Sequence, residues 1–225
     1  MRVVCFFYNL KTKIWFGIFL FLIGLAIGLS RFGLDLPVIS RYERVDAYPP
    51  LVYLPDYTTG PSIRASAAIL VEAVSGMILY AKNEHQRRGP ASTTKIMTAI
   101  VALEKGNLEE IVRISPRAAR TGGSSLWLKA GELIPLRELL EGMLLRSGND
   151  AAVALAEHIA GSEGAFVELM NRKAREIGAL NTNFRNTHGL TAPNHYSTAF
   201  DLAQITRYGF TNPEFSRIVG AKEEA

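Results

Sequence analysis

Residues 89–104, GPASTTKIMTAIVALE, decide the fold of this chain, because they combine a helix start with a pair of reactive side chains. After Pro90, apolar residues recur at helical spacing, and Gly106 follows the last of them. This pattern predicts a helix over about residues 92–104. The serine and the lysine of the stretch then lie on its first turn, where most helices carry only a cap and a solvated charge.

Ser92 and Lys95 are one helical turn apart, so the lysine amine can reach the serine oxygen. The start of a helix leaves backbone N–H groups unpaired and favours negative charge, which would stabilise an alkoxide on Ser92. Lys95 can accept the serine proton only when it is partly neutral, and burial lowers a lysine pKa. The ordinary alternative is a serine N-cap beside a solvated lysine.

A second motif, Ser147-Gly148-Asn149, falls between two predicted helices. Ser147 could hydrogen-bond Lys95 and relay a proton toward a leaving group, and the Asn149 side-chain amide could hold a substrate carbonyl. Gly148 would allow a tight turn. Taken alone, the string Ser-Gly-Asn-Asp is also a common helix start.

The remaining elements place these motifs in a mixed domain. Alternating apolar residues predict two strands at 67–71 and 77–80, joined by a turn at Ser75-Gly76. A lone hairpin leaves sheet edges uncovered, so we expect further strands after residue 225. The later predicted elements are a strand at 111–114 and helices at 136–145, 150–159, 165–177 and 201–208.

The N-terminal region has a different composition from the rest of the 225 residues. The formal net charge is +4, and residues 1–44 carry all of this excess. Residues 14–29 contain no charged side chain and follow two lysines, which predicts a signal peptide or signal anchor over 1–30. Residues 31–62 are rich in proline and tyrosine and are predicted to form an extended linker to a domain at 63–225. This distribution favours membrane targeting and argues against a nucleic-acid partner.

Cysteine and histidine usage limits the chemistry. Cys5 is the only cysteine, which excludes an intramolecular disulfide and a cysteine-rich metal site. The four histidines lack the spacing of a zinc motif, so we expect no metal or cofactor. For His188 and His195 we expect roles in the structure or at the rim of the site.

Four ordered blocks between Ser66 and Ile218 resemble one known family. They are PASTTKIMTAIVALE, GGSSLWLKAGE, LLRSGNDAAVALAEHIAGSEGAFVELMN, and NTHGL followed by HYSTAFDLA. Together they resemble the D-alanyl-D-alanine carboxypeptidases, which are low-molecular-mass penicillin-binding proteins of the S11 peptidase family. The resemblance implies an α+β transpeptidase fold like that of penicillin-binding proteins and β-lactamases, with a helical cluster and an antiparallel sheet.

The resemblance also implies a reaction outside the cytoplasm, at the bacterial cell membrane. Ser92 would be the acyl-ester nucleophile that attacks the bond between the last two D-alanines of a peptidoglycan stem peptide. Lys95 would be the general base, Ser147 the proton relay and Asn149 a substrate-binding residue. β-Lactams would acylate the same serine.

One family motif does not occur in this sequence. No Lys-Thr-Gly or Lys-Ser-Gly follows Asn149, and Lys129-Ala130-Gly131 precedes Ser147, which is the wrong order. We therefore expect a domain that is incomplete at its C-terminus, only marginally folded, and weakly active or inactive by itself. The alternatives are a non-catalytic, membrane-anchored cell-wall binding protein, a DD-endopeptidase, and a β-lactamase relative, which would be expected to carry Ser-Asp-Asn.

Overall fold

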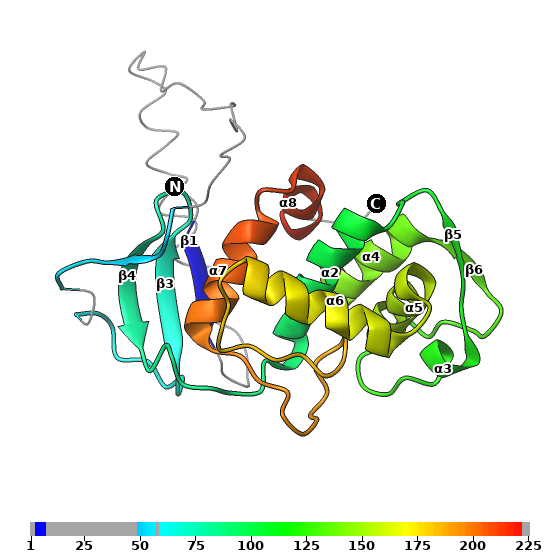
Figure 1. The fold of residues 1–225 in the computed structure, drawn as a ribbon, viewed down its shortest axis with the longest axis horizontal. Coiled ribbons are helices and arrows are strands. Elements are labelled where there is room, and N and C mark those ends of the chain that lie inside the picture. The colour runs from blue at the N-terminus through cyan, green and yellow to red at the C-terminus, as the bar shows by residue number, and fades with distance from the viewer. Residues whose placement is uncertain (1–2, 8–48, 57–58, 222–225) are drawn as a thin grey trace, which may run out of the picture.

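The computed structural model describes residues 3–7, 49–56 and 59–221, with a sheet at one end of a cluster of helices (Figure 1). Two strands predicted from sequence form its centre, β3 (Ala68–Glu72) and β4 (Met77–Lys82), paired antiparallel with Leu70 opposite Tyr80. The Glu72 carboxylate accepts hydrogen bonds from the N–H and the hydroxyl of Ser75 and so closes the turn between them. The predicted hairpin is confirmed.

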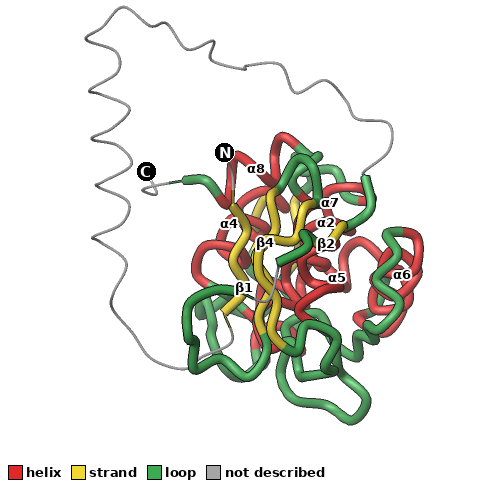
Figure 2. Tube along the Cα trace, turned by 90° about the vertical axis from the view of Figure 1, so that its left-hand side faces the viewer, coloured by secondary structure: helices red, strands yellow, loops and turns green. Residues whose placement is uncertain are grey.

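Two further strands flank this hairpin, and both come from earlier in the chain. Strand β1 (Val3–Phe7) pairs antiparallel with β3, and β2 (Val52–Tyr53) pairs parallel with β4. The order across the sheet is β1-β3-β4-β2, and Figure 2 shows these strands side by side in front of the helices. Both flanking strands therefore precede the hairpin in the chain, and the expectation of further strands after residue 225 stays a prediction. Val3–Phe7 also lies within the predicted signal segment, a prediction that its pairing does not test.

The helices follow the apolar periodicity of the sequence closely. The predicted helices and the strand at 111–114 are found within a few residues of their expected bounds, whereas the sequence analysis missed three short elements, α3 (Pro116–Ala119), β6 (Leu133–Pro135) and α8 (Pro213–Val219). The elements after the hairpin are a 3₁₀ turn (Ala91–Thr93), α2 (Thr94–Lys105), β5 (Ile111–Arg113), α3 (Pro116–Ala119), β6 (Leu133–Pro135), α4 (Leu136–Arg146), α5 (Asn149–Ala160), α6 (Glu163–Glu176), α7 (Ala199–Gly209) and α8 (Pro213–Val219).

The hydrophobic core lies mainly among the helices. Helix α2 contacts α4, α5, α6 and α7, so the reactive stretch of the sequence runs through the middle of this cluster. The side chains of Phe166, Phe184 and Phe215 are almost completely buried in the described structure. A second, smaller cluster joins Ile69 and Ile78 of the sheet to Ala203 of α7, which lies against the sheet (Figure 1).

The predicted membrane segment lies outside what the structure describes. The structure does not describe residues 8–48, which include residues 14–29, so the signal peptide or anchor stays a prediction. The same holds for most of the predicted linker at 31–62. In the described part of the chain, no helix has both the length and the apolar character needed to span a bilayer.

Candidate active site

Ser92 lies on the 3₁₀ turn that leads directly into α2, so the structure places it at the helix start as the sequence predicts. Its side chain is exposed, whereas Lys95 is buried. Ala91 has a φ of +48°, in the left-handed region that non-glycine residues seldom adopt. The hydroxyl of Thr93 donates to the Pro90 carbonyl at 2.5 Å and fastens the turn. Backbone strain next to a proposed nucleophile is typical of functional sites.

Lys95 is held by two acceptors from distant parts of the chain. Its Nζ donates to Oδ1 of Asn149 at 2.7 Å and to the backbone carbonyl of His188 at 2.8 Å. Burial lowers the pKa of Lys95 to about 8, and the negative charge of Asp150 opposes part of that shift. A lysine with such a pKa is partly neutral near physiological pH, which a general base requires.

Asn149 is the first residue of α5 and joins Lys95 to a neighbouring loop. Its backbone N–H donates to the Ser124 carbonyl at 2.8 Å, and its Nδ2 donates to the Gly122 carbonyl at 2.7 Å. A Cβ added to Gly123 would lie 2.5 Å from this Nδ2, so only glycine permits the close approach. The bond to Gly122 uses one amide hydrogen and leaves the second for another acceptor. Substrate binding by Asn149 stays a prediction.

Ser147 occupies the C-terminal end of α4 with a φ of +62°. Its Oγ is buried and makes no hydrogen bond with any residue in the described part of the chain. The hydrogen bond to Lys95 that we predicted is therefore not formed in this structure. A hydroxyl can rotate and recruit a partner when a substrate enters, so the proton relay through Ser147 stays a prediction.

Asp150 supports the site, and the sequence analysis did not single it out. Its fully buried carboxylate accepts hydrogen bonds from the Ser125 hydroxyl at 2.7 Å and from the backbone N–H groups of Leu126 and Leu128 at 3.0 and 3.2 Å. The loop that binds Asn149 is thereby fixed to the start of α5. In the sequence, Asp150 is indistinguishable from an ordinary acidic residue on a first helical turn.

His195 packs against the start of α2. The backbone N–H of Arg185 donates to Nδ1 at 2.9 Å, which places the proton of the neutral ring on Nε2, 3.0 Å from the Thr94 hydroxyl. Burial lowers the pKa of His195 to about 4, so the ring is neutral at physiological pH. No group of three or more His, Cys, Asp or Glu side chains in the described residues can hold a metal ion.

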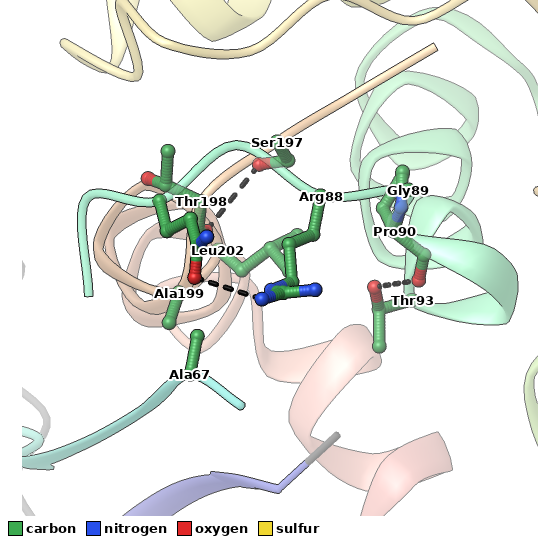
Figure 3. A pocket seen from close by; sticks show the side chains of 10 residues that line it. Ala67, Arg88, Gly89, Pro90, Thr93, Ser197, Thr198, Ala199 and Leu202 are labelled. Carbon is green, nitrogen blue, oxygen red and sulfur yellow. Dashed lines mark hydrogen bonds between the residues drawn. The ribbon is translucent and has the colours of Figure 1, made fainter. Parts of the chain in front are cut away.

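A small apolar pocket lies beside the Ser92 turn, between that turn and the start of α7 (Figure 3). Pro90 and Thr93 line one side, and Ala199 and Leu202 line the other. Arg88 also lines it, and its guanidinium donates to the Gln86 side chain at 2.8 Å. This pocket is not the site around Lys95, because none of the four predicted site residues lines it. Those residues are Ser92, Lys95, Ser147 and Asn149.

Comparison with known proteins decides the family. The family described as D-alanyl-D-alanine carboxypeptidase, peptidase S11, matches residues 55–225. The chain belongs to this family. It is 44% identical over 165 residues to the D-alanyl-D-alanine carboxypeptidase DacF of Bacillus subtilis, a match that covers 71% of this chain and 42% of DacF. It is also 44% identical over 156 residues to DacA of Escherichia coli K12, covering 64% of this chain and 39% of DacA.

Two solved structures have a fold similar to that of this chain. Penicillin-binding protein 6B from Escherichia coli superposes with a TM-score of 0.70 at 37% identity, over 76% of this chain and 58% of that one. The D-alanyl-D-alanine carboxypeptidase from Mycobacterium tuberculosis gives a TM-score of 0.70 at 34% identity, over 74% and 64%. The predicted family and α+β penicillin-binding-protein fold are confirmed. The chain spans about two fifths of the length of the curated relatives it matches.

Proposed function

We propose that this protein is a serine-type D-alanyl-D-alanine carboxypeptidase, which removes the terminal D-alanine from peptidoglycan stem peptides through an acyl-enzyme on Ser92. The observation that carries the proposal is the buried Lys95 amine, one helical turn from Ser92, with its pKa lowered to about 8. Family membership supports the substrate class.

The reaction begins with neutral Lys95, which takes the proton of the Ser92 hydroxyl. The Ser92 oxygen then attacks the carbonyl carbon of the penultimate D-alanine, and the backbone N–H of Ser92 helps to stabilise the oxyanion that forms. The C–N bond breaks as the proton returns from Lys95, directly or through Ser147, to the departing nitrogen. Water hydrolyses the acyl ester, which frees Ser92 and gives the shortened peptide.

The absence of a Lys-Thr/Ser-Gly sequence after Asn149 determines which step should be measured. The family resemblance implies that this motif supplies a lysine that binds the substrate carboxylate and one N–H group that binds the oxyanion. Loss of one oxyanion donor typically lowers rates by about 10²–10³. A covalent penicillin adduct accumulates even when it forms slowly, so acylation is a more sensitive assay of this chain than turnover of a stem peptide.

The experiment is covalent labelling of the full chain with penicillin, followed by intact mass measurement and peptide mapping. We expect an increment of one whole penicillin molecule on Ser92. Ser92→Ala should abolish it, and Ser66→Ala, which alters an exposed serine before β3, should leave it unchanged. An unmodified wild-type chain would overturn the proposal and favour a cell-wall binding protein without catalysis.

The proposed location is the extracytoplasmic face of the cell membrane, with residues 14–29 as a membrane segment or a cleaved signal. The sixteen uncharged residues after two lysines support this location. Carbonate extraction of cell membranes tests it, because an anchored protein stays in the pellet. Substituting two central leucines by arginine should release the protein from an anchored state or block its export.

A further inference from the structure

The segment Thr187–His188 lies against α2 through two consecutive backbone carbonyls. The Thr98 hydroxyl donates to the Thr187 carbonyl at 2.7 Å, and Lys95 Nζ donates to the His188 carbonyl at 2.8 Å. Lys95 and Thr98 are three residues apart and share one face of the helix. The position of this segment therefore determines whether the Lys95 amine keeps one of its two acceptors.

Glu163, the first residue of α6, holds the same segment from the other side. Its Oε1 accepts hydrogen bonds from the backbone N–H and the hydroxyl of Thr187, both at 3.0 Å, and lies 3.5 Å from Nε2 of His188. Its Oε2 accepts a hydrogen bond from the Arg117 guanidinium at 2.5 Å. The segment is thus bound on one side by α2 and on the other by Glu163, whose carboxylate is in turn bound by Arg117.

Helix capping does not explain why Glu163 is buried. The Ser162 hydroxyl already accepts the Ala165 N–H as the N-cap of α6. An exposed carboxylate on the first turn would interact favourably with the helix dipole without losing its hydration. Glu163 instead is only 7% exposed, and burial of a charge is unfavourable unless partners compensate. Those partners are Thr187 and Arg117, outside its own helix.

We propose that Glu163 is a positioning residue, which fixes Thr187–His188 so that the His188 carbonyl stays on the Lys95 amine and water stays out. The inference rests on the proposed function, in which Lys95 is the base. Glu163 acts on Lys95 through the position of the segment. The carboxylate whose charge acts on Lys95 is Asp150, whereas the charges of Glu163, Lys95 and Arg117 act on His188.

Release of the segment would therefore change the titration of Lys95. Burial is the main cause that lowers the Lys95 pKa to about 8, so entry of water raises the pKa toward its ordinary value. A raised pKa leaves less neutral base at neutral pH. Each unit of increase lowers the neutral fraction about tenfold well below the pKa.

The test compares Glu163→Gln with Glu168→Gln, which removes the same charge from an exposed position on the same helix. The rate of acylation of the full chain by a fluorescent penicillin is followed from about pH 6 to 10.5. For the wild type and Glu168→Gln we expect a rise with a midpoint near pH 8. Glu163→Gln should shift the midpoint to higher pH and lower the neutral rate about tenfold, with recovery at high pH. An unchanged midpoint would overturn the proposal.

A second readout separates this inference from the proposed function. NMR titration of ¹³Cε-labelled lysine, with the Lys95 signal assigned by its loss in Lys95→Arg, measures the pKa without any reaction. A raised pKa in Glu163→Gln supports the positioning role even in a chain that penicillin does not label, and an unchanged pKa overturns it. Should Glu163→Gln fail to fold, Thr187→Val removes one of its contacts and should raise the pKa less. No shift in Thr187→Val would then overturn the role.

Discussion

The helical cluster and the sheet differ in how they relate to the candidate site. Lys95, Ser147 and Asn149 are all placed by α2, α4 and α5, and their supports come from loops that pack on these helices. The sheet contributes none of the predicted site residues, and its buried cluster is small. The difference teaches that the site around Lys95 is organised by helices and by the loops packed on them, without a side chain from the sheet, so we expect that the two regions can be perturbed separately.

The largest expected effect comes from removing the base inside the helical cluster. Lys95→Ala should lower the rate of acylation by about 10²–10⁴-fold, because it removes the amine that we propose takes the Ser92 proton. Stopped-flow labelling with a fluorescent penicillin measures the rate. Lys105→Ala, at the exposed end of the same helix, serves as the control and should match the wild type. A Lys95→Ala rate within tenfold of the wild type would refute a general-base role.

Two core truncations, one in each region, test whether the helical cluster and the sheet can be perturbed separately. Phe166→Ala in the helical core should lower the free energy of unfolding by about 3–5 kcal/mol and also slow acylation. Ile69→Ala in the sheet cluster should cost about 2 kcal/mol and leave the acylation rate of the folded protein within a few fold. Urea unfolding gives the first quantity and penicillin labelling the second. Equal losses of acylation in the two variants would show that the sheet does organise the site.

Gly189→Ala tests the contact between the residue that follows His188 and the turn that carries Ser92. A Cβ on Gly189 would lie 1.8 Å from the Ala91 carbonyl oxygen and 3.0 Å from the Ser92 nitrogen. Gly189→Ala should therefore displace Ser92 and slow acylation about 10²-fold. Gly161→Ala is the matched control, because Gly161 has a similarly positive φ of +76° but no atom nearby. Equal acylation rates in the two variants would mean that the contact has no catalytic importance.

The smallest expected effect is a shift in pH dependence. The negative charge of Asp150 raises the pKa of Lys95, so Asp150→Asn should lower it below about 8 and move the acylation midpoint to more acidic pH. The sign is opposite to that expected for Glu163→Gln. The pH profile of penicillin labelling measures it. An alkaline shift would show that loosening of the loop at Ser125–Leu128 outweighs the lost charge.

Much of the secondary structure could be predicted from the sequence, because apolar periodicity reflects which face of each long helix is buried. The Ser92–Lys95 pair was predicted from local spacing, and Asn149 from a second short motif. The short elements α3, α8 and β6 were missed, because a few residues give too little periodicity. Pro213 after the cap Asn212 is the signal that could have located α8.

The supports of the site could not be predicted, because they depend on long-range packing. The His188 carbonyl that binds Lys95 is 93 residues away along the chain. Asp150 and Glu163 both look like acidic residues on first helical turns, and only the fold turns their carboxylates inward. The relay role of Ser147 was inferred from the motif, and its hydroxyl has no hydrogen-bond partner among the described residues.

Arg207 of α7 has a mechanical consequence for the whole domain. Its guanidinium donates to the carbonyls of Ala73 and Val74 in the hairpin turn and to that of Pro49, at 2.9, 3.2 and 3.1 Å. A pull on the chain ahead of Pro49 would therefore load the hairpin and α7 first. Ser92 makes none of these three hydrogen bonds, so such a load would act on the hairpin and α7 before it acts on the nucleophile.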